Sequence, residues 1–63
     1  MVTIAELRAK HNKMSQRELA EKIGTTQTSI SLWEKDIDTI SMPFLKKIAR
    51  FFDVSTDELL GLK

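Results

Sequence analysis

The chain has 63 residues, with 10 lysines and arginines against 9 aspartates and glutamates, a formal net charge of +1 and no cysteine. A chain of this length forms one domain, here residues 1–63, which is too small for a roomy active site. The lack of cysteine excludes a disulfide framework and a thiolate metal site, and the modest charge excludes a binder that depends on global attraction to phosphate.

The first predicted helix spans about residues 4–12. Ile4 and Leu7 recur at helical spacing and form its buried stripe, and Met14 in the following turn is expected to pack beneath them. Thr3 precedes this helix and Glu6 follows three residues later, which is the spacing of a capping box. The start of this helix is therefore specified by neighbouring residues in the sequence.

The second predicted helix begins at Gln16 and is about two turns long. Ser15 offers a hydroxyl to the free N–H groups of the first turn, and Glu18 can reach back to the backbone of Ser15. Apolar residues then recur at helical spacing up to Ile23. Gly24 follows, at the point where helices commonly end in a left-handed conformation that glycine adopts without penalty.

A third helix is predicted after a short polar turn, with Thr26 as its N-cap. Ile30 and Trp33 form its buried side, and Ile37 extends that stripe just beyond the helix. At about 100° per residue, the opposite face is formed by Thr28, Ser31 and Lys35, flanked by Gln27 and Leu32.

This outer face has the chemistry of a base-reading surface. A glutamine can pair with the N6 and N7 edge of adenine, hydroxyl groups can meet several base edges, and apolar atoms suit the thymine methyl. Lys35, near the helix end, is placed for a phosphate. The alternative is a solvated face in a small bundle, although such faces more often carry Glu, Lys and Arg.

Two further helices are predicted in the C-terminal part. Ser41 is expected to cap the first, since Pro43 is tolerated in a first turn, where its missing N–H has no intrahelical partner. Ser55 and Glu58 repeat the capping-box spacing before a short last helix. No strand pattern is evident, so the predicted fold class is all-α. The expected core residues of this part are Leu45, Ile48, Ala49, Phe52, Val54, Leu59 and Leu60.

Three segments of the chain, SQRELAEKIG, TTQTSISLWE and LKKIARFFDVSTDELL, together with their spacing, carry a family resemblance. Over about Ile4 to Leu60 the chain resembles the phage Cro and repressor type of helix-turn-helix proteins, also called the xenobiotic-response-element family. The resemblance implies a compact five-helix domain of the lambda-repressor type. In such a domain helices 2 and 3 form the helix-turn-helix, here residues 16–35, and the third helix enters the major groove of operator DNA.

The resemblance also implies roles for individual residues. Gln27 and Thr28 are the expected leading base readers, and Ser31 and Leu32 also face bases. Gln16 matches the family glutamine that contacts backbone phosphate and often braces the first recognition residue. The residues expected to contact the DNA backbone are Gln16, Arg17, Thr26, Ser29 and Lys35.

Two features depart from the family pattern. Asp36 and Asp38 occupy a loop where relatives usually have a glycine and basic residues, so the loop is either turned away from phosphate or DNA binding is weaker than in typical relatives. The turn before Met14 is one residue longer than the common pattern. Whether Arg8 and Glu34 form the ion pair of the family is therefore left open.

The remaining charged and aromatic residues each allow two interpretations. For Lys46, Lys47 and Arg50 we weigh phosphate contact and plain solvation equally. Apolar residues in the C-terminal part exceed what the core stripes need, and they either widen a helix face covered within the chain or form a homodimer contact that sets two recognition helices about 34 Å apart on DNA. These residues are Phe44, Phe51 and Leu62.

Enzymatic chemistry finds little support in the sequence. His11 is the only histidine, and its position four residues after Leu7 favours a partly buried packing role over general-base chemistry. No Gly-rich phosphate loop is present, and neither a metal nor a cofactor is expected. The N-terminus lacks the pattern of a secretory signal and no apolar run reaches membrane-span length, so we expect a cytoplasmic protein without a membrane segment.

We interpret the chain as a sequence-specific double-stranded DNA-binding domain and not an enzyme. The expected action is that of a repressor or related regulator that reads a palindromic operator through the major groove. The alternative is a protein-interaction module, such as an antitoxin-like or developmental-regulator domain, for which DNA binding is secondary. The acidic residues of the Asp36 loop favour this alternative more than any other feature.

Overall fold

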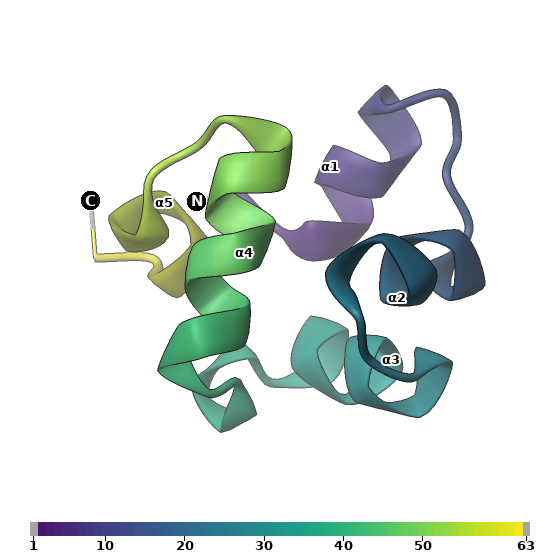
Figure 1. Cartoon of the computed structure of the whole chain (residues 1–63). Helices are drawn as coiled ribbons and strands as arrows, with labels where there is room; N and C mark the ends of the chain where they lie inside the picture. The colour runs from purple at the N-terminus through teal and green to yellow at the C-terminus, as the bar shows by residue number, and fades with distance from the viewer. Residues whose placement is uncertain (1, 63) are drawn as a thin grey trace.

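The computed structural model describes residues 2–62, and the fold of this part is all-α with no strand, as predicted (Figure 1). The elements in chain order are α1 (Ile4–Lys10), α2 (Gln16–Ile23), α3 (Gln27–Lys35), a 3₁₀ turn η1 (Ile37–Thr39), α4 (Met42–Phe52) and α5 (Thr56–Leu60). The N-terminal three helices and the C-terminal two pack around one core, so each helix buries one stripe and leaves the other in solvent.

Every α-helix starts directly after its predicted N-cap residue, although one of these residues makes no capping hydrogen bond. Ser15 accepts a hydrogen bond from the Glu18 backbone N–H at 3.0 Å, and the Glu18 carboxylate accepts from the Ser15 N–H, which is a complete capping box. Ser55 forms the same box at α5, whereas at α1 only the forward bond of Thr3 is present. Ser41 is the N-cap residue of α4, as predicted, but its side chain makes no capping hydrogen bond. Proline in the first turn of α4 removes one of the N–H groups that such a cap would serve.

The end of α1 differs from the prediction. The helix ends at Lys10, two residues earlier than expected, and the chain then turns through Asn12 at φ +57° and Lys13 at φ +53°. These left-handed residues absorb the extra length of the turn before Met14. As a result the Met14 N–H donates to the Arg8 carbonyl at 3.0 Å.

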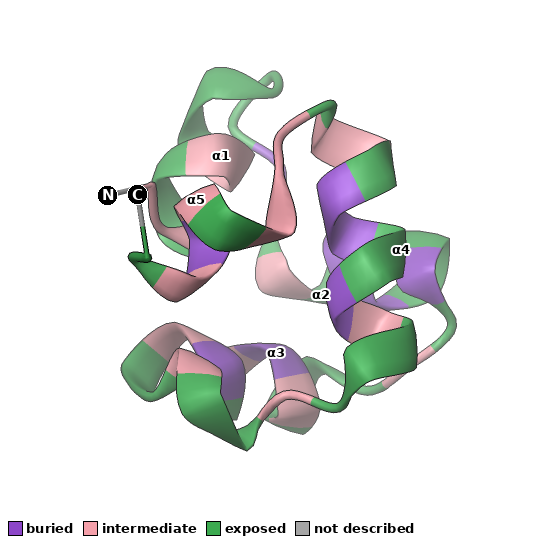
Figure 2. Cartoon of the chain, turned by 90° about the vertical axis from the view of Figure 1, so that its left-hand side faces the viewer, coloured by how far each residue is buried: buried purple, intermediate pink, exposed green. Residues whose placement is uncertain are grey.

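The core is apolar throughout and is formed by all five helices. Figure 2 shows the buried residues on the inward sides of the helices. The buried residues are Ile4, Met14, Leu19, Ala20, Ile23, Ile30, Trp33, Leu45, Ile48, Ala49 and Leu59. Most predicted core residues are among them. Leu7, Ile37, Phe52, Val54 and Leu60 are half-buried and pack against its margin.

The acidic loop after α3 forms a 3₁₀ turn that the sequence interpretation did not predict. The Asp36 carboxylate accepts from the Asp38 backbone N–H at 3.1 Å, so Asp36 acts as the cap of η1. Ile37 and Ile40 flank the turn and pack against the core. The Asp36 carboxylate therefore has a structural role in ending α3 and starting the path to α4. Within residues 2–62, no helix has the length and apolar character needed to cross a bilayer.

Candidate nucleic-acid interface

The rotation of α3 about its axis is fixed by its inner side. Ile30 is fully buried, Trp33 is 7% exposed, and the Trp33 ring lies 5.3 Å from that of Phe44 on α4. Gly24 ends α2 at φ +85°, a left-handed conformation that turns the chain sharply into α3. Because Ile30 and Trp33 face the core, the residues on the opposite side of α3 do not pack against another element of the domain.

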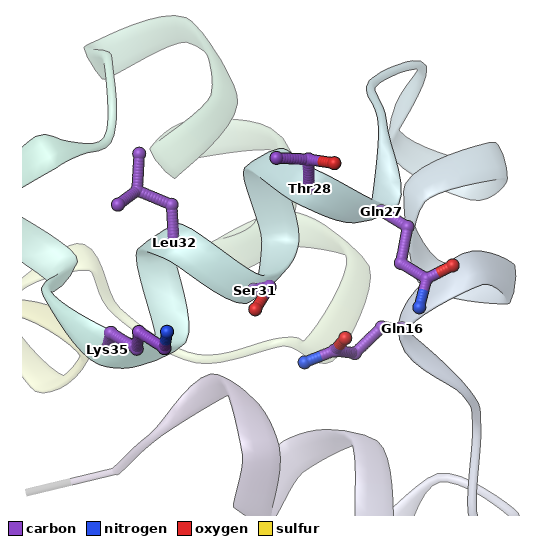
Figure 3. A pocket seen from close by; sticks show the side chains of 6 residues that line it. All are labelled: Gln16, Gln27, Thr28, Ser31, Leu32 and Lys35. Carbon is purple, nitrogen blue, oxygen red and sulfur yellow. The ribbon is translucent and has the colours of Figure 1, made fainter.

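Six of the nine residues predicted to contact DNA line one open hollow of about 420 Å³. Gln16 enters it from the start of α2, and the other five side chains come from α3 (Figure 3). The lining residues are Gln16, Gln27, Thr28, Ser31, Leu32 and Lys35. The hollow thus presents amides, hydroxyls, one isobutyl group and one cation, which is the set of groups that the sequence placed on the outer face.

The α3 side chains of this hollow are not engaged elsewhere in the domain. Within residues 2–62, the side chains of Gln27, Thr28, Ser31 and Lys35 make no hydrogen bond or ion pair with the rest of the protein. Leu32 is 50% exposed, although a leucine gains from burial. These donors, acceptors and apolar atoms remain available to a ligand that approaches α3.

The three other residues predicted to contact the DNA backbone lie outside the hollow. Thr26 accepts a hydrogen bond from the Ser29 backbone N–H at 3.1 Å, and the two hydroxyls lie 3.0 Å apart, so this pair caps the start of α3. Arg17 is exposed, with its Nε 3.5 Å from a Glu21 carboxylate oxygen on the same helix. A phosphate role for Arg17, Thr26 and Ser29 remains a prediction.

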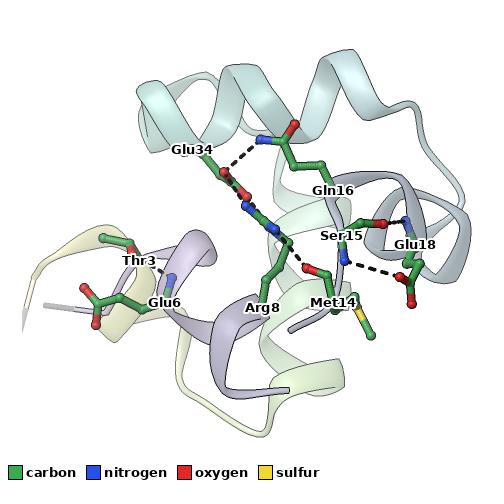
Figure 4. A network of polar contacts seen from close by, with 8 residues as sticks. All are labelled: Thr3, Glu6, Arg8, Met14, Ser15, Gln16, Glu18 and Glu34. Atoms are coloured by element: carbon green, nitrogen blue, oxygen red, sulfur yellow. Dashed lines mark hydrogen bonds and ion pairs between the residues drawn. The ribbon is translucent and has the colours of Figure 1, made fainter. Parts of the chain in front are cut away.

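Beneath the hollow, a polar joint ties α1, α2 and α3 together (Figure 4). The Arg8 guanidinium donates to both carboxylate oxygens of Glu34, at 2.6 and 3.0 Å, and to the Met14 carbonyl at 2.8 Å. The Arg8 and Glu34 side chains are only 18% and 12% exposed. The family ion pair is therefore present in spite of the longer turn, and the Met14 carbonyl after that turn accepts a further hydrogen bond from Arg8.

Gln16 connects this joint to the hollow. Its side-chain amide donates to the Glu34 carboxylate at 2.9 Å, and no hydrogen bond joins it to Gln27 among the described residues. The bracing of Gln27 that the resemblance implied is thus absent here, and Gln16 is instead oriented by α3 from below. The sequence interpretation missed this role of Glu34, which rests on a contact across 18 residues that no local spacing reveals.

His11 and the extra aromatic residues are used for packing. His11 is exposed rather than partly buried, but its ring lies 5.3 Å from that of Phe51 and 5.8 Å from that of Phe52. Phe44 and Phe51 are half-buried at the core margin, which supports the interpretation that they widen a covered face. Leu62, in contrast, is 74% exposed. No group of three potential metal-ligating side chains occurs in residues 2–62.

Comparisons with known proteins agree with this geometry. A family model described as helix-turn-helix matches residues 4–59. The chain is similar to the HTH-type transcriptional activator BcrR of Enterococcus faecalis, with 40% identity over 58 residues, and to the uncharacterized HTH-type transcriptional regulator YobD of Bacillus subtilis (strain 168), with 37% identity over 59 residues.

These matches cover 92% and 94% of the chain but only 28% of BcrR and 52% of YobD. The chain thus spans about a quarter and about half the length of these two relatives. No solved structure gives a significant match.

Proposed function

The chain belongs to the Cro/repressor-type helix-turn-helix family, and from this membership we propose that it reads double-stranded DNA through α3. The members of this family are DNA-binding regulators and not enzymes. One observation carries the proposal. The outer side of α3 presents a hollow whose α3 polar groups have no partner within the described chain.

The lining side chains suit the edges of base pairs in the major groove. The Gln27 amide can donate to adenine N7 and accept from N6, and the Thr28 and Ser31 hydroxyls can donate or accept. Leu32 offers apolar atoms for a thymine methyl, which accounts for an exposed leucine at this position. We therefore assign base contacts to Gln27, Thr28, Ser31 and Leu32.

Contacts to the DNA backbone surround these base readers. Lys35 is the one cation of the hollow, and Arg17, Thr26 and Ser29 lie near the starts of α2 and α3, where helix N–H groups suit phosphate. The Gln16 side-chain amide donates one of its two hydrogens to Glu34, so a phosphate contact of this residue would use the other hydrogen or its backbone N–H. With a net charge of +1, nonspecific attraction is weak and the base contacts must supply much of the affinity.

We further propose that the protein acts as a cytoplasmic homodimer on a palindromic operator. Two recognition helices about 34 Å apart would read two half-sites on one face of the duplex. Phe44 and Phe51 are mostly committed to their own domain, so the dimer contact would depend on Leu62 and its surroundings. Occupancy of such an operator would repress a promoter that overlaps it. Sedimentation at micromolar concentration, with and without operator DNA, should show a dimer that Leu62→Ser weakens.

Selection of bound duplexes from a random DNA pool tests the function directly. At modest salt, we expect enrichment of one motif with two-fold symmetry. The alternative function is a protein-interaction module, which the acidic residues of the Asp36 loop favour. The Asp36 carboxylate caps η1, so its presence has a structural reason that does not require a protein partner. A pool that yields no enriched motif would overturn the DNA-reading proposal and favour the alternative.

A further inference from the structure

A second hollow of the surface, of about 370 Å³, lies between α2 and α4. Its residues come from the last turn of α2 and from the middle and end of α4, two helices that pack against each other (Figure 1). We refer to this hollow as the basic groove, and it is lined by Lys22, Ile23, Lys47, Arg50 and Phe51. It shares no residue with the hollow on α3.

The basic groove combines three cations with an apolar floor. Lys22, Lys47 and Arg50 are exposed, whereas Ile23 is buried and Phe51 is half-buried. Among residues 2–62, no carboxylate lies within 4.0 Å of the three charged groups. The Lys47 ammonium group lies 5.4 Å from the centre of the Phe44 ring, a contact that holds the cation without neutralising it.

The position of the groove separates it from the proposed DNA face. Gln16 lines the α3 hollow, and Lys22 lies six residues further along α2, which is about 9 Å along the helix axis. A duplex docked on the outer side of α3 therefore meets the first turn of α2 and not its last. None of the DNA contacts proposed above uses Lys22, Lys47 or Arg50.

We propose that the basic groove binds an acidic peptide segment of a partner protein, with carboxylates flanking two adjacent bulky apolar side chains. The carboxylates would pair with Lys22, Lys47 and Arg50 at the rim, and the apolar side chains would contact Ile23 and Phe51. Charge complementarity selects this partner, and the apolar floor favours a peptide over a phosphate backbone, which offers no side chain to cover it. A volume of about 370 Å³ accommodates a few side chains of such a segment.

The arrangement would let one domain hold DNA and a protein at the same time. The α3 hollow and the basic groove lie on different elements except for α2, which contributes its first turn to one and its last turn to the other. Partner recruitment at the groove does not require any base-reading side chain. The inference is therefore independent of the DNA-reading proposal.

A nuclear magnetic resonance titration of the isotope-labelled chain tests the proposal. The probe is the synthetic peptide EDELFDED, and the two control peptides are QNQLFNQN, which lacks the charges, and EDESSDED, which lacks the apolar side chains. We expect saturable shifts of the backbone amides of Lys22, Ile23, Lys47, Arg50 and Phe51 with the first peptide, and much weaker shifts with both controls. Absence of saturable shifts, equal shifts with QNQLFNQN, or shifts centred on α3 would each overturn the proposal.

Charge-reversal variants provide a matched control on one helix. Lys47→Glu should weaken peptide binding about two- to tenfold, as expected for an exposed ion pair replaced by repulsion, whereas Lys46→Glu, the neighbouring exposed lysine outside the groove, should change it much less. Equal losses for the two variants would mean attraction to net charge alone and would overturn the site.

Titration with duplex DNA should shift the amides of α3 and of the first turn of α2. If the duplex instead shifts the groove amides, the groove is a nucleic-acid contact and the peptide proposal is wrong.

Discussion

The polar residues of α3 and its cap fall into two groups that differ in where their hydrogen bonds go. Thr26, Ser29 and Glu34 are engaged within the chain, the first two as the cap of the helix and the third with Arg8 and Gln16. Gln27, Thr28, Ser31 and Lys35 have no such partner among the described residues. The first group builds the domain and the second is available to a ligand, so composition alone does not separate structural from functional polar residues.

The difference is also one of charge. The largely buried Glu34 carboxylate is neutralised by Arg8, so it adds little negative potential beneath the face proposed to meet DNA. A carboxylate at that place without its partner would repel phosphate. These contacts thus fix the position of α3 on α1 and α2. They also keep the electrostatic potential beneath α3 compatible with an anionic ligand.

The largest expected effect is on stability, from Glu34→Ala. This change leaves the Arg8 guanidinium and the Gln16 amide without their shared acceptor, and it should lower the free energy of unfolding by about 2–3 kcal/mol. In a domain whose core supplies only about 3–5 kcal/mol, this loss would leave a net stability of about 0–3 kcal/mol. Urea denaturation measures the loss, and Glu34→Gln, which keeps an acceptor for Arg8, should lose less. A loss below about 0.5 kcal/mol for Glu34→Ala would show that the joint is not structural.

Gln27→Ala should affect recognition rather than folding. We expect it to reduce discrimination at one base-pair position by about 1–3 kcal/mol, while the urea midpoint stays unchanged. Binding to the selected duplex and to its single-base variants gives this value. Equal losses on specific and random DNA would assign Gln27 to general contact instead of base reading.

Thr26 and Thr28, both near the start of α3, belong to different groups, so substitution of each by alanine compares the two groups directly. Thr26→Ala removes the cap and should cost about 1 kcal/mol of stability, whereas Thr28→Ala should stay within about 0.5 kcal/mol and weaken binding to the selected duplex. Thermal or urea unfolding and DNA binding of the same two samples are the required measurements. The grouping fails if Thr28→Ala destabilises the domain as much as Thr26→Ala does.

The smallest expected effect belongs to Lys35→Ala. Loss of one phosphate contact should weaken binding to all sequences alike and reduce the slope of log affinity against log salt by about 1. Lys22→Ala removes the same charge at the far end of α2 and should leave this slope nearly unchanged, because Lys22 does not line the α3 hollow. Equal changes of slope for the two variants would contradict a local role for Lys35.

Features encoded within a few neighbouring residues were predictable from the sequence. The caps by Ser15, Thr26 and Ser55, the left-handed end at Gly24 and the buried side of α3 all depend on spacings of one helical turn or less, and the structure confirms them. Five of the six residues of the α3 hollow follow from the same periodicity once α3 is packed, whereas Gln16 on α2 was expected only from the family resemblance. Their contacts with DNA stay a prediction.

Features that depend on distant residues or on one chemical detail were not predictable in this way. The contacts of Glu34 with Arg8 and Gln16 join residues 26 and 18 positions apart. The left-handed turn at Asn12 and Lys13 was not predicted, because neither residue is the glycine that usually signals such a conformation. The basic groove arises only when α2 and α4 pack together, because Lys22 on α2 is far in the sequence from Lys47 and Arg50 on α4.

The claim that the unengaged side of α3 reads bases is tested most directly by repeating the random-pool selection with the double variant Gln27→Ala, Thr28→Ala. Neither side chain has a partner in the described chain, so the variant should fold with an unchanged urea midpoint and still bind duplex DNA through its backbone contacts. We predict an enriched motif that has lost its base preference at the positions under these residues. Enrichment of the same motif as the parent protein, with the same preference at every position, would contradict the assignment of α3 as the reading helix.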